Sequence, residues 1–316
     1  MVGYNPDIKL TKADQAQAGA VSNIVARAVV QPFDVLKIRF QLQVEPISSS
    51  SSSSKYRSIL QAIRCIVREE GPRALWKGHV PAQILSVGFG VVEFTCFEYI
   101  TKILWYGLPE SFQTRYKPLA HALGGSLSST LATVVIQPVD IIRTRIIAQG
   151  EPKVYRSMYH AASSIIRTEG FRGFYKGLAP ACLGVAPQMG LQFGFYSLLQ
   201  NVWNSAFDLS QRPYPGAVES FICGSGSGFL SKLLMYPMDV TKKRLQIQGF
   251  EEARKNFGAV RQYKGVVHCI KQSLKDEGLR GMYKGLSPSL LKAVFVSGTI
   301  FCVYDQVCYV FMMKNR

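Results

Sequence analysis

Long apolar segments and short amphipathic segments alternate regularly along the chain. The short segments carry apolar residues at helical spacing, as at Ile59, Ile63, Ile66 and Val67 on one face of the first. Each short segment lies between two apolar segments that have the length of a helix crossing a bilayer. The pattern predicts an all-α membrane protein with three short amphipathic helices and six membrane-spanning helices, at residues 16–40, 81–105, 119–147, 180–206, 217–245 and 288–313.

Charged side chains interrupt the apolar segments at Arg27, Glu93, Lys232 and Lys292. A charge at membrane depth is costly, and such residues usually face the interior of a helix bundle or a water-filled cavity. We therefore expect the six long helices to surround an aqueous cavity rather than to pack as a solid bundle.

The motif Pro-x-Asp-x-x-Lys/Arg recurs near the end of every second apolar segment, at residues 32–37, 138–143 and 237–242. Proline inside a helix removes a backbone hydrogen bond, and an acid and a base three residues apart share one helix face. Downstream of each copy come a Glu-Gly pair, which ends the short helix, and an aromatic-Lys-Gly triplet. The chain is thus an internal triplicate, with repeats at residues 14–105, 116–206 and 215–313.

Composition and charge narrow the possible functions. The chain is 47% hydrophobic with mean hydropathy +0.09 and a formal net charge of +17. Such a basic excess fits nucleic acid, an anionic membrane or an anionic ligand, but the basic residues occupy equivalent places in the repeats instead of one stripe, which disfavours nucleic acid. The cysteines and histidines form no metal-ligand or nucleophile pattern and there is no Gly-rich phosphate loop, so we expect no metal, no cofactor and no enzyme.

The three Pro-x-Asp-x-x-Lys/Arg copies and the three aromatic-Lys-Gly triplets, spread over nearly the whole chain, resemble the mitochondrial carrier family. The resemblance implies a threefold pseudo-symmetric barrel of six transmembrane helices with three short helices on the matrix side. It also implies one central cargo site, alternating access across the inner mitochondrial membrane, and both termini in the intermembrane space. The three repeats would together form one transport domain, and we expect a monomer because that unit encloses its own cavity.

The resemblance also assigns a gate to the repeated motif. On the matrix side the acids and bases would form a closed ring of ion pairs, Asp34 with Arg143, Asp140 with Lys242, and Asp239 with Lys37. Glutamines one turn further along would brace this ring at Gln41 and Gln246, whereas the second repeat has Ile147 there. Individual pairs of this kind are modest in energy, which suits a gate that opens in every cycle.

A second gate, expected on the cytoplasmic side of the even-numbered helices, is degenerate in this sequence. Glu98 is followed by Thr101 where the family has a base, and Asp305 is followed by Cys308. No complete ion pair can form from these positions. Our hypothesis is therefore a weak cytoplasmic gate and a ground state that is open to the cytoplasmic side.

Basic and hydroxyl side chains at one depth indicate an anionic cargo. Arg27, Thr133 and Lys232 each lie five residues before a motif proline, and Lys292 lies near the third contact point implied by the family. Together they predict a cationic floor for a phosphate or diphosphate. The alternative is that Arg27 or Lys232 snorkels or pairs with a neighbouring acid.

The fourth long helix carries features suited to a planar ring. Gly184 leaves a gap beside the aliphatic Val185, and the amides of Gln188 and Gln192 can read the donors and acceptors of a heterocycle. Leu85 is the apolar contact point of the second helix. Glu93 is a candidate for the cationic or amino end of the cargo.

The aromatic-Lys-Gly triplets resemble the cardiolipin sites of the family, at helix N-termini where backbone N–H groups favour phosphate. They place candidate lipid sites at Gly78, Gly177 and Gly285. The companion Tyr-x-Gly sequence is intact only at Tyr263 and Gly265, because Ser58 and Ser157 replace its glycine in the other repeats.

Loop segments at residues 148–155, 175–180 and 284–293 extend the resemblance to members of the family that carry thiamine pyrophosphate. On this likeness we expect a multi-pass carrier in the inner mitochondrial membrane that imports thiamine pyrophosphate, in exchange for nucleotides. A carrier for adenine nucleotides or coenzyme A is the alternative within the family. A basic nucleic-acid-binding or scaffold protein is the alternative from another class.

Overall fold

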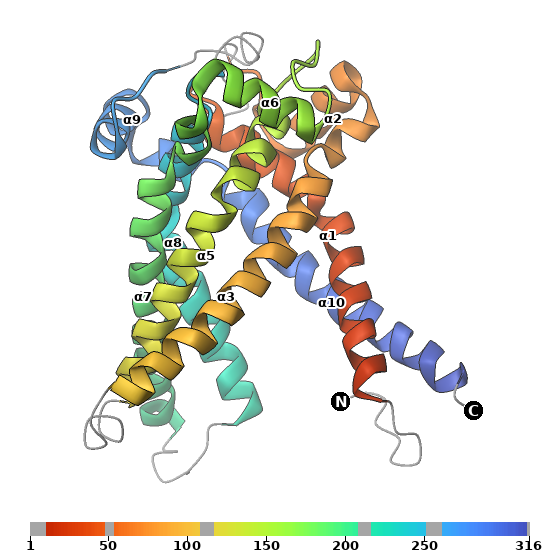
Figure 1. Cartoon of the computed structure of the whole chain (residues 1–316), viewed down its shortest axis with the longest axis vertical. Coiled ribbons are helices and arrows are strands. Elements are labelled where there is room, and N and C mark those ends of the chain that lie inside the picture. Colours follow the sequence, from red (N-terminus) through yellow and green to blue (C-terminus); the bar gives the residue numbers. More distant parts are fainter. Residues whose placement is uncertain (1–10, 48–53, 108–116, 208–215, 251–260, 315–316) are drawn as a thin grey trace.

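The chain folds into long and short helices whose order repeats three times (Figure 1). The computed structural model describes residues 11–47, 54–107, 117–207, 216–250 and 261–314, and within them every regular element is helical. The elements in chain order are α1 (Lys12–Leu42), α2 (Ile59–Glu70), η1 (Pro72–Trp76), α3 (His79–Gly107), α5 (Lys117–Ala148), α6 (Met158–Glu169), η2 (Phe171–Tyr175), α7 (Leu178–Phe207), α8 (Ala217–Gln246), α9 (Val266–Gly281) and α10 (Leu286–Lys314).

Side chains and glycines define where the short helices begin and end. The hydroxyl of Ser58 accepts a hydrogen bond from the backbone of Gln61, and that of Ser157 accepts one from His160, so serine caps both α2 and α6. Gly71 and Gly170 follow these helices at positive φ, as expected from the Glu-Gly pairs. The helices α2, α6 and α9 each begin three residues after a tyrosine that recurs in the repeats, at Tyr56, Tyr155 and Tyr263.

The long helices pack mainly across repeat boundaries. The most extensive contacts join α1 with α10, α3 with α5, and α7 with α8. The short helices α2, α6 and α9 gather at one end of the molecule, hereafter the short-helix end, whereas α1 begins and α10 ends at the opposite end (Figure 1).

The outer faces of the long helices expose large apolar side chains, among them Phe94, Phe193, Phe221 and Phe301. Such a surface suits lipid rather than water. By length and hydropathy alone, two segments of the described residues qualify as membrane spans, Pro72–Ile103 and Leu286–Met313. Helices α1, α5 and α8 carry the charged motifs, which lower their mean hydropathy.

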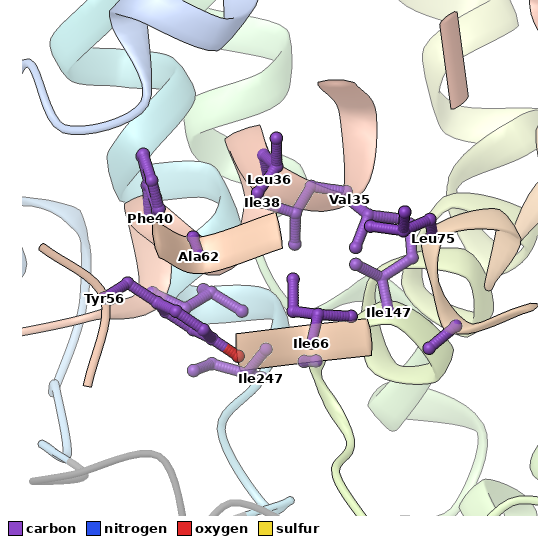
Figure 2. Close-up of a cluster of buried hydrophobic side chains, with 13 residues drawn as sticks. Val35, Leu36, Ile38, Phe40, Tyr56, Ala62, Ile66, Leu75, Ile147 and Ile247 are labelled. Atoms are coloured by element: carbon purple, nitrogen blue, oxygen red, sulfur yellow. The ribbon is translucent and has the colours of Figure 1, made fainter. Parts of the chain in front are cut away.

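An apolar cluster fills the short-helix end and joins all three repeats (Figure 2). Ile66 of α2 is fully buried in it, and the second and third repeats contribute Ile147, in the last turn of α5, and Ile247, directly after α8. Ile59 and Ile63 pack against its edge, as the helical spacing predicts. Val67 is exposed instead, so its assignment to the buried face of α2 was wrong. Of the four apolar residues predicted for that face, only the three isoleucines contact the cluster.

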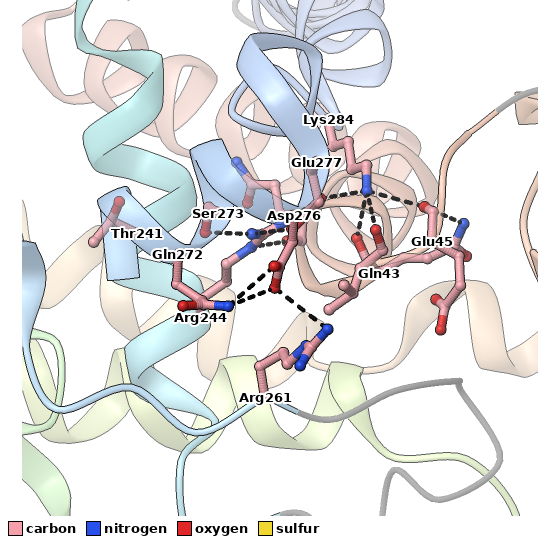
Figure 3. A network of polar contacts seen from close by, with 12 residues as sticks. Gln43, Glu45, Thr241, Arg244, Arg261, Gln272, Ser273, Asp276, Glu277 and Lys284 are labelled. Atoms are coloured by element: carbon pink, nitrogen blue, oxygen red, sulfur yellow. Dashed lines mark hydrogen bonds and ion pairs between the residues drawn. The ribbon is translucent and has the colours of Figure 1, made fainter. Parts of the chain in front are cut away.

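A buried ionic network recurs in each repeat at the short-helix end. An arginine just beyond the motif forms two hydrogen bonds with the Glu of the Glu-Gly pair, and the Lys of the aromatic-Lys-Gly triplet pairs with the same carboxylate. Figure 3 shows the third copy, in which Lys284 also donates to backbone carbonyls of residues 43–45. The three copies are Arg39–Glu70–Lys77, Arg145–Glu169–Lys176 and Arg244–Glu277–Lys284.

Each network arginine also ties its repeat to the next one. The Nε of Arg39 donates to the carbonyl of Ile147 at 3.2 Å, that of Arg145 to Gln246 at 3.2 Å, and that of Arg244 to Gln41 at 3.1 Å. These contacts run around the molecule in one direction and close on themselves. They hold the ends of α1, α5 and α8 together.

The network should make the folded state less stable at acidic pH. Burial alone would raise the pKa of Glu70, but hydrogen bonds from Arg39 and Lys77 outweigh it and hold the pKa below its usual value of 4.5. A carboxyl whose pKa is lower in the folded state stabilises the fold above its unfolded pKa and loses that contribution as pH falls. We expect the melting temperature in detergent to decline below pH 4.5.

Thermal denaturation across a pH series measures this dependence. Glu98→Gln, which removes an acid from the exposed Glu98–Lys102 pair, is the matched control and should leave the profile unchanged. If Glu70→Gln showed the same decline of melting temperature at acidic pH as the parent protein, Glu70 would not be the cause of that decline.

Candidate functional site

The acids and bases of the repeated motif form three ion pairs between different long helices. Asp34 Oδ2 lies 2.6 Å from Arg143 Nη2, Asp140 Oδ2 lies 2.8 Å from Lys242 Nζ, and Asp239 Oδ2 lies 3.4 Å from Lys37 Nζ. The structure thus contains each pairing that the resemblance implies. These six side chains, hereafter the motif ring, connect α1, α5 and α8 into a closed triangle.

Each acid of the motif ring also contacts a second cation. Lys292 of α10 lies 2.7 Å from Asp34, and Lys232 of α8 lies 3.6 Å from Asp239. Both lysines were predicted as cargo contacts, and here they pair with acids of the ring. The alternative interpretation anticipated this pairing for Lys232 but not for Lys292. Six cations around three acids leave the ring positively charged, so an anion entering it meets an attractive field.

The second cation on Asp140 is Lys243, which sequence reasoning missed. Its Nζ donates to both carboxylate oxygens of Asp140, at 2.9 and 3.1 Å, to Thr144 Oγ1 at 3.0 Å and to Gln246 Oε1 at 2.9 Å. The available signal was weak: Lys243 directly follows a motif base, whereas Ile38 and Thr144 stand there in the other repeats.

The two predicted braces behave differently. Gln246 donates to Asp140 Oδ2 at 2.8 Å and so contacts an ion pair of the ring. Gln41 donates to the hydroxyl of Tyr236 at 3.2 Å, and that hydroxyl in turn donates to the carbonyl of Lys284. Through Tyr236, Gln41 therefore supports the turn that precedes α10.

The glycines of the aromatic-Lys-Gly triplets pack closely against the motif helix of the next repeat. All three have positive φ, and a Cβ added to Gly285 would lie 2.7 Å from the carbonyl oxygen of Lys37. A Cβ on Gly177 would lie 2.9 Å from the carbonyl of Lys242, and one on Gly78 would meet Ile147. Backbone conformation and packing thus require glycine here, independently of any lipid.

Gly285→Ala is expected to lower thermal stability by about 1–3 kcal/mol, because alanine is strained at this φ and its methyl group would push Lys37 away from the ring. Melting in detergent measures the loss. Gly298→Ala, within the helix that Gly285 precedes, is the matched control, since no atom lies within 4 Å of an added Cβ there. Equal melting temperatures for both variants would contradict the packing argument.

Two cavities open onto the motif ring. The first has a volume of about 250 Å³ and is lined by Leu85, Phe89 and Ile136 together with Lys37, Asp140 and Lys243. The second, of about 170 Å³, is lined by Gly184, Val185, Gln188, Met235 and Met238. Thr133, Asp239 and Lys242 line both cavities, so the two meet at the ring.

The remaining predicted cargo residues lie apart from these cavities. Arg27 donates to the carbonyl of Ala82 at 3.5 Å, and Glu93 accepts a hydrogen bond from Ser129 of α5. Gln192 is exposed. Of the predicted cargo residues, the structure therefore brings Leu85, Thr133, Gly184, Val185 and Gln188 to the cavities. It does not bring these three there, and Lys232 and Lys292 do not line either cavity.

At the opposite end, the predicted degenerate gate contains a local contact. Glu98 pairs with Lys102, one turn along α3, at 2.8 Å, and both side chains are exposed. Asp305 is also exposed. Among the described residues, the ion pair of Glu98 is thus with its own helix, as the incomplete motif predicts.

The candidate lipid residue Gly265 caps α9 with a φ of 165°, which is extended backbone that any residue adopts. The carbonyl of Tyr263 accepts a hydrogen bond from Gln248 at 2.7 Å. The backbone therefore gives no reason of its own for glycine at position 265, in contrast to Gly285.

A threefold helical repeat, an apolar outer face and a charged ring beneath internal cavities define a class of membrane transporter. The sequence model of the family described as mitochondrial carrier protein matches residues 9–107, 114–207 and 214–315. The chain belongs to the mitochondrial carrier family, and it is a multi-pass solute transporter of the inner mitochondrial membrane rather than an enzyme.

Curated relatives match over nearly the full length. The chain is 49% identical over 319 residues to the mitochondrial thiamine pyrophosphate carrier of Homo sapiens, covering 100% of this chain and 98% of the relative. It is 36% identical to the mitochondrial thiamine diphosphate carrier 1 of Zea mays, covering 92% and 91%. It is 34% identical to the mitochondrial thiamine pyrophosphate carrier 1 of Emericella nidulans, covering 94% and 92%.

Proposed function

We propose that this carrier imports thiamine pyrophosphate into the matrix in exchange for nucleotides. The observation that carries the proposal is the pair of cavities that meet at the motif ring, because they combine a cationic floor with an apolar wall. A diphosphate needs the first and a heterocycle needs the second. The names of the relatives support the same cargo.

The ring supplies the gate of an alternating-access cycle. In this proposal the repeats at residues 14–105, 116–206 and 215–313 form one transport domain, a six-helix barrel with the short helices on the matrix side. The closed ring then separates the cavities from the matrix, and the degenerate far end leaves them open to the cytoplasmic side. Cargo phosphates would compete with Asp34 and Asp239 for Lys292 and Lys232, which weakens the ring as cargo binds.

Adenine nucleotides or coenzyme A are the second candidate cargo. A Cβ added to Gly184 would find no atom within 4 Å, so the cavity of about 170 Å³ is open beside Gly184 and Val185. An open site beside an aliphatic side chain accepts an adenine as well as an aminopyrimidine.

Reconstitution in liposomes tests the proposal. Labelled thiamine pyrophosphate should enter vesicles loaded with ADP or ATP faster than empty vesicles, and unlabelled thiamine pyrophosphate should compete. Exchange of ADP for ATP without uptake of thiamine pyrophosphate would favour the second candidate. Absence of both activities in a folded, reconstituted protein would refute both.

Lys292→Met is expected to raise KM for thiamine pyrophosphate about tenfold, because a charge-assisted hydrogen bond contributes roughly 1.5–3 kcal/mol. Asp34 keeps its pairing with Arg143 in this variant, so the ring should still close. Initial uptake rates over a concentration series measure the change. Lys102→Met removes an exposed lysine of α3 and is the control. An unchanged KM would remove Lys292 from the cargo site.

We also propose that the protein works as a monomer with cardiolipin bound near Gly78, Gly177 and Gly285. The turns at these glycines precede α3, α7 and α10, whose first N–H groups suit a phosphate. Native mass spectrometry of the purified protein, with and without added cardiolipin, tests both the mass of the assembly and the retained lipid.

A further inference from the structure

The three acids of the motif ring are not equivalent. The side chain of Asp239 is 37% exposed, against 9% for Asp34 and 11% for Asp140. Both cations that contact Asp239 lie near the same oxygen, Oδ2, at 3.4 and 3.6 Å. The cations on the other two acids lie at 2.6 to 2.9 Å. Asp239 therefore has the longest ion pairs and the greatest access to water.

Asp239 also has the position that a cargo can reach. It lines both cavities, whereas Asp140 lines the larger one only and Asp34 lines neither. The apolar residues Met235 and Met238 and the Gly184–Val185 wall lie in the same cavity as Asp239. A ring held against that wall therefore lies beside a partly exposed carboxylate.

We propose that Asp239 binds the cationic ring of the cargo and is the acid that selects for it. The inference rests on the proposed function, because thiamine pyrophosphate combines an anionic diphosphate with a positively charged thiazolium. As the thiazolium approaches Asp239, Lys37 and Lys232 are released and pair with the diphosphate. Ion pairs are exchanged rather than broken, so no charge is left alone in the cavity.

Two features of the structure favour Asp239 over the other acids near the cavities. Glu93 is hydrogen-bonded to Ser129 and lines neither cavity. Asp140 is held by Lys242, Lys243 and Gln246 together, all from α8. The exchange at Asp239 also loosens the contact between α1 and α8, so recognition of the cargo and opening of the ring become one event.

The test compares the Kd of thiamine pyrophosphate with that of its thiophene isostere, which keeps the diphosphate and the shape but lacks the ring charge. Titration calorimetry on the full-length protein in detergent gives both values. The parent protein should prefer the charged compound, and Asp239→Asn should reduce that preference by about tenfold. Asp34→Asn and Asp140→Asn are the matched controls. They should raise the Kd of both compounds by the same factor and so leave the preference unchanged.

Lys37→Gln provides a test in the opposite direction. Removing a cation that competes for Asp239 should increase the preference for the charged compound, a result that misfolding cannot produce. An unchanged ratio in both Asp239→Asn and Lys37→Gln would overturn the inference, as would loss of the preference in Glu93→Gln. Failure of the parent protein to bind thiamine pyrophosphate would instead refute the proposed function.

Discussion

Asp140→Asn should reduce exchange by roughly a hundredfold or more, the largest loss that we expect from one substitution in the motif ring. The change leaves Lys242 and Lys243 side by side with no carboxylate between them. Removing one partner of a buried ion pair costs about 3–5 kcal/mol, and each ~1.4 kcal/mol corresponds to a factor of ten. This energy destabilises the state in which the ring is closed, so the carrier completes its cycle much more rarely. Initial rates of cargo exchange in liposomes measure the effect.

Lys243 allows this explanation to be checked. Lys243→Met alone should reduce exchange less than Asp140→Asn, because Lys242 and Gln246 still hold the carboxylate. Lys243→Met combined with Asp140→Asn should recover part of the lost activity, since one unpaired cation remains instead of two. Additive losses in the combined variant would show that repulsion between the lysines is not the cause.

The helices were predictable from local sequence, and the pairing of the motif ring was predictable from the resemblance to a known family. Apolar length and the recurring motif placed six long helices, and each predicted span lies within an observed helix, as for residues 16–40 in Lys12–Leu42. The pairing of Asp34 with Arg143 followed from threefold repetition and the family resemblance. Repetition alone allows pairing within one helix or a ring in either direction, and the resemblance selected the ring that the structure contains.

Contacts that depend on side-chain reach could not be predicted. The arginines after the motif and the Glu-Gly pairs were visible as repeated residues, yet their meeting requires the turn between two helices to be known. Lys243 has no counterpart in the other repeats, so its contact with Asp140 could not be inferred from the repetition. Lys292 was predicted as a cargo contact but lines neither cavity, and its contact with Asp34 depends on how closely α10 packs against α1.

The buried network at the short-helix end should contribute the largest stability effect, and Glu169 is its most sensitive member. Arg145 is fully buried, with 0% of its side chain exposed, and Glu169 supplies its carboxylate partner. We expect Glu169→Leu to destabilise the protein by about 3–5 kcal/mol, because it leaves a guanidinium charge in the interior. Thermal unfolding in detergent measures the loss.

The relative stabilities of three variants distinguish the effect of the buried charge from the effect of packing. Arg145→Leu should cost less than Glu169→Leu, because Glu169 keeps Lys176 at 2.5 Å. The combined Arg145→Leu/Glu169→Leu variant should also be more stable than Glu169→Leu, since the lysine left behind is 33% exposed and can turn to water. If packing alone governed the site, the double variant would be the least stable of the three.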